Sequence, residues 1–174
     1  MDSKTSLSAH LNIVAKILNS SRNILSGIQK ETNYNDEPKT YTYTTTYKTD
    51  HLDHENVAGG TSFSKDLALM RALGETIERY CISKPRNKKI ALIGTQDQSS
   101  ELIDLAQFTD FPINYSKRTT FKCVNGFSLN ENKAVLIPAQ LVYLSYPTSN
   151  EPVIRFGTST GAAAGKDIKS ALYT

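Results

Sequence analysis

The sequence has 174 residues, which is enough for one domain with a hydrophobic core or for part of a larger one. Hydrophobic residues make up 39% and charged residues 21%, as in soluble globular proteins, and the net charge of +3 comes without the basic stripe of a nucleic-acid-binding surface. No apolar run reaches membrane-spanning length and no signal pattern opens the chain, so we expect a cytoplasmic protein that contacts neither nucleic acid nor membrane.

The N-terminal part predicts a helix followed by a linker. Apolar residues recur at helical spacing over residues 5–19, namely Leu7, Leu11, Val14, Ala15 and Leu18. A polar stretch that contains a proline, QKETNYNDEPK, follows this pattern. We therefore predict residues 1–30 as an N-terminal helix and linker, and residues 31–174 as the main domain.

A strand and a long helix come next. Tyrosine and threonine alternate in TYTYTTTYKTD, which predicts a half-buried strand with Tyr41, Tyr43 and Tyr47 on its packing face, although these rings are also candidates for stacking on a ligand. Residues 64–81 predict a helix with Ser64 as its N-cap. Its expected apolar stripe consists of Leu67, Met70, Leu73, Gly74, Ile77 and Cys81.

The second half alternates between short predicted elements. After KPRNKK, which we interpret as a solvated loop, KIALIG predicts a strand and SSELIDLAQF a short helix. TTFKCVNGFSL and KAVLIPAQLVYLSY predict an antiparallel pair joined through NENK. The last segment, PVIRFGTSTGAAAGKDIKSALYT, predicts a strand, a small-residue loop and the start of a helix. The predicted fold class is α/β, with a mixed α+β sheet and flanking helices.

Two segments share one layout that suits anion binding. GGTSFSKDLAL and FGTSTGAAAGKDIKSAL both read Gly-Thr-Ser, small residues, Lys-Asp and a helix. A loop that ends at a helix N-terminus leaves backbone N–H groups for a phosphate, although such sequences also form ordinary turns. Neither segment is a Walker motif or a dinucleotide fingerprint.

Two acids and an arginine lie close together on the long helix. Glu75 and Glu78 are three residues apart, so both carboxylates emerge on one face, and Arg79 is four residues from Glu75. One interpretation is a surface cluster with an ordinary ion pair. The other is a site for Mg²⁺, which prefers one or two carboxylates together with substrate phosphates, beside an arginine that binds phosphate.

Other chemistry-bearing residues give weaker signals. HLDHE, from His51 to Glu55, is a candidate metal site, but its order is not HExxH, and we favour a solvated loop. His10 is expected at the surface. Cys81 and Cys123 have no metal-ligand spacing, so we expect two free thiols in the core.

Two motifs resemble the YcaO family. GGTSFSKDLALMRALGETIERY resembles the first family signature, a Gly-rich start before an ALGEAIER-like helix, and STGAAAGKDIKSAL resembles the second, SNGLAAGNTLEEAI. The resemblance covers residues 40–82 and 150–174 well, which corresponds to the N-terminal part of the family's domain. It implies an ATP- and Mg²⁺-dependent enzyme that acts on peptide backbone amides.

The resemblance also implies roles for particular residues. Glu75 and Glu78 match the metal-binding acids, and Arg79 matches the arginine of the motif. The nucleotide-contacting residues implied are Ser159, Thr160, Gly161, Ala164 and Gly165. The chain lacks the second acidic helix of the family, so whether this chain alone is an enzyme stays open.

The variant of the chemistry and the partners follow from the same resemblance. The motifs look most like cyclodehydratases that convert Cys, Ser or Thr to azolines in ribosomally made thiazole/oxazole-modified peptides. The implied partners are a peptide substrate with its leader, a leader-docking protein and, as a further candidate, a second copy of the chain. The alternatives are thioamide or amidine formation, or a non-catalytic split half that binds a peptide or a partner.

Overall fold

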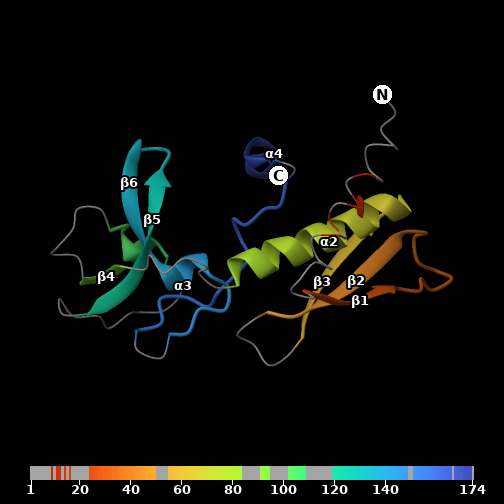
Figure 1. Cartoon of the computed structure of the whole chain (residues 1–174), viewed down its shortest axis with the longest axis horizontal. Coiled ribbons are helices and arrows are strands. Elements are labelled where there is room, and N and C mark those ends of the chain that lie inside the picture. Colours follow the sequence, from red (N-terminus) through yellow and green to blue (C-terminus); the bar gives the residue numbers. More distant parts are fainter. Residues whose placement is uncertain are drawn as a thin grey trace. The chain divides into compact units, whose positions relative to one another are not determined.

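The computed structural model describes residues 9, 11, 12, 14, 16, 24–49, 55–83, 91–94, 102–108, 119–148, 151–165 and 167–173. The chain folds into two compact units. The first consists of Met1–Cys81 and Gly161–Thr174, and the second of Ile82–Thr160. Each unit is described by itself below, and Figure 1 shows the elements of both.

The first unit contains a three-stranded antiparallel sheet in the order β1-β2-β3. Strand β2, Tyr41–Tyr47, confirms the predicted alternation, because Tyr43, Thr45 and Tyr47 are all buried. Strand β1, Leu25–Lys30, lies where the sequence predicted a helix and linker. The sequence did not predict this strand because most of its side chains are exposed, so it has no alternating buried face. Hydrogen bonds to β2 hold the strand in the sheet.

The third strand corrects one of the two predicted loops. Gly59, Gly60, Thr61 and Ser62 belong to β3, Asn56–Ser62, and pair with β2 over its whole length. Gly60 allows close packing here, because a Cβ atom on it would lie 2.4 Å from the backbone nitrogen of Ala72 in the helix α2, Lys65–Ile82. Glycine in a strand often marks such a close backbone approach.

Helix α2, Lys65–Ile82, confirms the strongest predicted element, and the Ser64 carbonyl accepts its first bond from the Ala68 N–H at 2.9 Å. Its buried face differs from the predicted stripe and consists of Ala68, Ala72, Leu73, Thr76 and Tyr80. Leu67 and Cys81, both predicted in the stripe, are exposed. Small residues face the sheet because the helix and β3 approach so closely.

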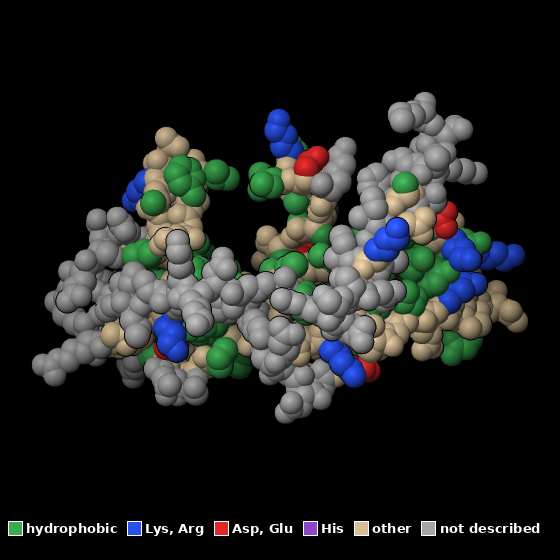
Figure 2. Space-filling view, in the orientation of Figure 1, with side chains coloured by type: hydrophobic (Ala, Val, Ile, Leu, Met, Phe, Trp, Pro, Cys, Tyr) green, Lys and Arg blue, Asp and Glu red, His purple; other side chains and the backbone are tan. Residues whose placement is uncertain are grey.

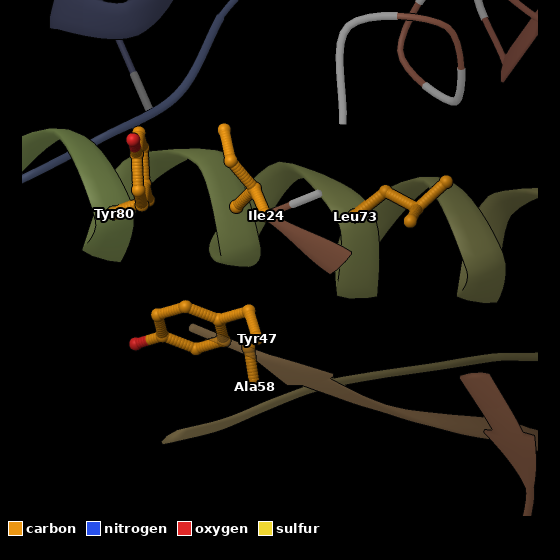
Figure 3. Packing of buried hydrophobic residues seen from close by; sticks show 5 residues of the cluster. All are labelled: Ile24, Tyr47, Ala58, Leu73 and Tyr80. Atoms are coloured by element: carbon orange, nitrogen blue, oxygen red, sulfur yellow. The ribbon is translucent and has the colours of Figure 1, made fainter. Parts of the chain in front are cut away.

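The core of this unit lies between α2 and the sheet. Figure 3 shows Tyr47 from β2 and Ala58 from β3 facing Leu73 and Tyr80 of α2, with Ile24 beside them. The predicted N-terminal helix is supported where it is described, because Ala9, Leu11, Asn12, Val14 and Lys16 are helical. Two of these residues, Leu11 and Val14, pack against the same core.

The second unit contains another three-stranded antiparallel sheet, in the order β4-β5-β6. Its strands are β4, Ala91–Gly94, β5, Thr120–Ser128, and β6, Lys133–Pro138. The pairing of β5 with β6 confirms the predicted hairpin. The buried cluster below it contains Leu105, Phe121, Cys123, Leu136 and Ile154.

Three predictions in this unit are wrong in part. The helix predicted over residues 99–108 is, in its described part, a single 3₁₀ turn, η1, Leu105–Gln107, which Asp104 caps. The second hairpin strand ends at Pro138 and continues as a short helix, α3, Ala139–Val142. The strand predicted from residue 152 is irregular, because the Gln140 side chain bonds the Pro152 carbonyl and the Ile154 N–H in place of a neighbouring strand.

The chain's last element is helix α4, Ile168–Leu172, which confirms the predicted helix start. The Asp167 side chain and the Ser170 hydroxyl form a capping box at its N-terminus. Ile168 and Leu172 of α4 and Phe127 of the β5–β6 hairpin are exposed. Figure 2 shows hydrophobic side chains at the surface over both elements. Among the described residues, no helix combines the length and the apolar character needed to cross a membrane.

Candidate functional site

The charged residues of α2 form a connected cluster in the first unit. The Arg79 Nη2 atom lies 2.6 Å from Glu75 Oε1, the ion pair expected from their spacing. The other oxygen, Glu75 Oε2, accepts a hydrogen bond from the Gly59 N–H of β3 at 2.7 Å. Glu75 is therefore held from two sides, by its own helix and by the edge strand of the sheet.

A buried pair of hydroxyls includes Thr76, the residue that follows Glu75 in α2. Thr45 Oγ1 of β2 is 2.7 Å from Thr76 Oγ1 of α2 and 3.2 Å from the Ala58 carbonyl oxygen. The Ala58 carbonyl and the Gly59 N–H are the two ends of one peptide unit. Thr45 and Glu75 thus contact opposite ends of the same peptide group, which joins the buried hydroxyls to the charged cluster.

Glu78 is the carboxylate of the cluster whose protonation is perturbed. Burial, first, and the nearby Glu75 charge raise the pKa of Glu78 above its ordinary value, while Arg79 and a hydrogen bond from the Ala164 backbone N–H lower it. The raising causes prevail, so the ionised form of Glu78 is under-compensated by its protein neighbours. A cation beside Glu75 and Glu78 would supply the missing compensation.

Arg79 offers an unused donor in the same place. Its Nε is buried and has no hydrogen-bond partner among the described residues, while its Nη2 binds Glu75. An unpaired buried donor carries a free-energy cost that an acceptor removes. The guanidinium is therefore suited to an anionic ligand, and its charge also acts on the buried Tyr47, whose pKa is raised by burial, lowered by Arg79 and raised by Glu75.

The donor set fits Mg²⁺ held jointly with a phosphate. Within the part of the chain that the structure describes, no three His, Cys, Asp or Glu side chains come together as a self-sufficient metal cage. Two carboxylates with phosphate oxygens are, however, a common shell for Mg²⁺. Each Glu75 oxygen has one protein partner, and each can accept a second interaction.

The residues implied by the second motif are divided between the units. Gly161, Ala164 and Gly165 belong to the first unit, where Ala164 meets Glu78. Ser159 and Thr160 belong to the second unit. There, Thr160 lines a cavity of about 410 Å³ together with Phe127, Tyr143, Arg155 and Phe156.

The helix N-terminus where the sequence predicted anion binding is capped by Asp167. Helix α4 is five residues long, and Asp167 Oδ1 accepts the Ser170 N–H at 2.8 Å while the Asp167 carbonyl accepts the Ala171 N–H at 3.1 Å. The first of these bonds takes one of the helix's N-terminal amides, and the second is the first regular bond of the helix. In the loop before α4, Gly161 has φ 88°, a conformation that favours glycine, and a Cβ on Gly165 would lie 2.6 Å from the Ala171 nitrogen.

The sequence did not single out Thr45, Thr76 or Gly59 as members of the site. One signal was present, because Thr76 is a polar residue inside the buried stripe of an amphipathic helix. The other candidates fall mostly elsewhere. His10, the first four residues of HLDHE and the run KPRNKK lie outside the described residues, while Glu55 makes an exposed ion pair with Lys48 at 3.8 Å.

The thiols are not part of the cluster's chemistry. Cys81 and Cys123 are both free, but only Cys123 is buried, so the expectation that both lie in the core is wrong for Cys81. Burial, together with the Glu151 charge, raises the pKa of Cys123 to about 11. A thiol with such a pKa is almost wholly protonated at neutral pH and is a poor nucleophile.

Comparisons with known proteins identify the family and the fold. Residues 59–174 match the family model described as YcaO cyclodehydratase, ATP- and Mg²⁺-binding. The fold is similar to YcaO from Methanopyrus kandleri bound with AMPPCP and Mg²⁺, at 15% identity and a TM-score of 0.68 over 96% of this chain and 40% of that one. It is also similar to a heterocyclase in complex with substrate and cofactor, at 17% identity and a TM-score of 0.76 over 95% and 26% of the two chains. Curated proteins gave no significant match.

Proposed function

The chain belongs to the YcaO family, and from this membership we propose that it carries part of a Mg²⁺- and ATP-dependent site that activates peptide backbone amides. The chain spans 40% and 26% of the two solved structures it resembles, so the activity of the whole protein is part of the proposal. The observation that carries it is the under-compensated carboxylate of Glu78, which lies near Glu75 and beside the unpartnered Nε of Arg79.

The acids would hold the metal and the arginine would hold phosphate. Glu78 needs a cation to offset burial and the Glu75 charge, and Glu75 is already aimed by Gly59 and Arg79. Arg79 Nε, with no acceptor among the described residues, would donate to a phosphate oxygen. Bound Mg²⁺ and ATP would supply the phosphoryl group that turns an amide oxygen into a leaving group.

The loop residues would contact the nucleotide through their backbone. Gly161, Ala164 and Gly165 present a main chain without bulky side chains, and Ala164 already meets Glu78. Ser159 and Thr160 are proposed as further contacts from the preceding segment. We leave the α4 terminus out of this site, because the helix is only five residues long and Asp167 caps it through the Ser170 N–H.

The proposed substrate is a ribosomally made peptide whose Cys, Ser or Thr side chains become azolines. The proposed partners are the leader of that peptide, a leader-docking protein and a second copy of the chain. Thioamide or amidine formation uses the same activated amide with another nucleophile and remains the alternative chemistry. A non-catalytic role as a split half is the second candidate, favoured by the presence of only two clustered carboxylates among the described residues.

Calorimetry of Mg²⁺ and ATP binding tests the proposal. The wild-type chain is compared with Glu75→Gln and Glu78→Gln, and with Glu131→Gln as a matched control, because Glu131 makes an exposed ion pair with Lys133 at 3.0 Å in the other unit. We expect the first two variants to lose Mg²⁺-dependent ATP binding and the control to retain it. Equal binding by all four proteins would overturn the assignment of the acids.

A further inference from the structure

Two buried threonines connect α2 to the sheet at the position of the acids. Thr45 on β2 and Thr76 on α2 are both 0% exposed, and their hydroxyl oxygens are 2.7 Å apart. Thr76 follows Glu75 directly and precedes Glu78 by two residues. Its side chain points into the core while those of its charged neighbours emerge on the accessible side.

The two hydroxyls are fully engaged with backbone carbonyls as well as with each other. Thr76 Oγ1 contacts the Ala72 carbonyl at 2.8 Å, and Thr45 Oγ1 contacts the Ala58 carbonyl at 3.2 Å. The two hydroxyls have two protons for these three contacts, so two of the three are hydrogen bonds at any moment and no proton remains for a group outside the network. Buried hydrogen-bonded pairs of this kind require a particular relative position of the two elements, which apolar contacts require less strictly.

One peptide unit of β3 connects the two hydroxyls to the charged cluster. The Ala58 carbonyl that meets Thr45 shares a peptide unit with the Gly59 N–H that binds Glu75 Oε2. The close packing of Gly60 against Ala72 brings the same stretch of β3 against α2. A slide or rotation of α2 would break the hydroxyl contact and the Glu75 contact together.

We propose that Thr45 and Thr76 are positioning residues, which fix the height and rotation of α2 so that Glu75 reaches Gly59 and Glu78 reaches Ala164. The inference rests on the proposed function for its consequence, because the positions of Glu75 and Glu78 decide how a metal would be held. Its structural statement is independent of any ligand. Packing alone would keep α2 on the sheet, whereas the hydroxyls determine where along the sheet it lies.

Four variants distinguish an effect on the position of α2 from an effect on the stability of the chain. Thr45→Val and Thr76→Val each remove one hydroxyl at nearly constant volume and leave the other hydroxyl with one contact fewer. The double variant removes both hydroxyls, so no hydroxyl is left in the core without the other. Thr76→Ser retains the hydroxyl and serves as the conservative control.

The readouts are the backbone amide resonances of Gly59 and Ala164, which report the bonds to Glu75 and Glu78, together with thermal unfolding. We expect both amides to move upfield in the single valine variants and in the double variant, and to keep wild-type positions in Thr76→Ser. The double variant should regain much of the thermal stability lost in the singles without regaining the amide positions. Unchanged amides in a destabilised valine variant would overturn the proposal, because the pair would then only contribute to packing.

A binding measurement on the same variants tests the consequence. The double variant should bind Mg²⁺ and ATP about tenfold more weakly than wild type. A tenfold change in affinity is similar in free energy to the net contribution of one hydrogen bond. Failure of the wild-type chain to bind Mg²⁺ and ATP would count against the proposed function and leave the amide result to decide the positioning role. Full wild-type affinity in a double variant whose amides have moved would overturn the functional part of the inference.

Discussion

Gly60 of β3 lies so close to Ala72 of α2 that a side chain has no room between them. A Cβ atom on Gly60 would be 2.4 Å from the Ala72 nitrogen and 2.5 Å from the Ala68 carbonyl oxygen. Both atoms are backbone and belong to a regular helix, so neither can move aside alone. The separation of α2 from the sheet, and with it the reach of Glu75 to Gly59, depends on this glycine.

Gly60→Ala is expected to destabilise the chain by about 1–3 kcal/mol, the usual cost of forcing an extra methyl group into a packed interface. Gly74→Ala is the matched control, because Gly74 lies in α2 and a Cβ there meets nothing within 4 Å. The control should stabilise the chain by about 0.5–1 kcal/mol, since alanine loses less backbone entropy in a helix. Urea unfolding of both variants measures the two free energies of unfolding, and a stable Gly60→Ala variant would contradict the close approach.

Glu78→Gln is expected to change stability in a pH-dependent way. Burial raises the pKa of Glu78 in the folded chain above the ordinary value of 4.5, so the unfolded chain releases this proton at lower pH than the folded chain does. As pH rises between these two pKa values, the free energy of unfolding falls and then stays lower. Glutamine avoids this loss and retains an acceptor for the Ala164 N–H.

The variant should therefore be more stable than wild type near neutral pH without Mg²⁺, and the advantage should disappear well below the ordinary pKa. Thermal unfolding across the acid range measures the difference. Wild type and variant that differ by the same amount at every pH would show that the folded environment does not raise the pKa of Glu78.

The two thiols are expected to react at very different rates. Cys81 is exposed, whereas Cys123 is 1% exposed and its pKa is raised to about 11. A thiol reagent near neutral pH should modify Cys81 quickly and Cys123 only after denaturation, because the thiolate is the reactive form. Cys81→Ser should remove the fast reaction, and rapid labelling of that variant in its folded state would contradict the burial of Cys123.

Arg79→Lys is expected to weaken nucleotide binding more than it weakens the fold. Lysine keeps a positive charge near Glu75 but has no counterpart of the Nε donor that lacks a partner among the described residues. We expect a change in unfolding free energy within about 0.5 kcal/mol, because the ion pair is partly exposed, and a loss of ATP affinity of about tenfold. Calorimetry beside urea unfolding separates the two effects, and unchanged affinity would show that Arg79 does not contact phosphate.

Local pattern predicted the elements that bury an alternating or periodic face. The alternation of tyrosine and threonine, with Tyr41, Tyr43 and Tyr47 on one face, predicted β2, and helical spacing with Ser64 at its start predicted α2. The β5–β6 hairpin followed from two apolar runs and a polar turn. In the site, the ion pair between Glu75 and Arg79 followed from helical geometry alone.

The parts of the fold and of the site that local pattern did not predict depend on contacts between residues distant in sequence. Gly59 and Gly60 have the composition of a loop, and only the approach of α2 shows why a glycine is needed at position 60 of the strand. The same approach buries Ala68 and Ala72 where hydrophobicity favoured Leu67. Gln140 replaces a strand partner for residues 152–154, a role that no local pattern indicates.

The bond from the Gly59 N–H to Glu75 joins an amide on the edge strand of the sheet to a carboxylate of the charged cluster. When that carboxylate turns toward a new partner, the amide loses its acceptor and faces water. Hydrogen exchange at Gly59 then accelerates while exchange within the β2–β3 ladder stays slow. The hydrogen-exchange rate of the Gly59 amide therefore reports whether Glu75 is bound to it, and this rate is measured without an enzymatic assay.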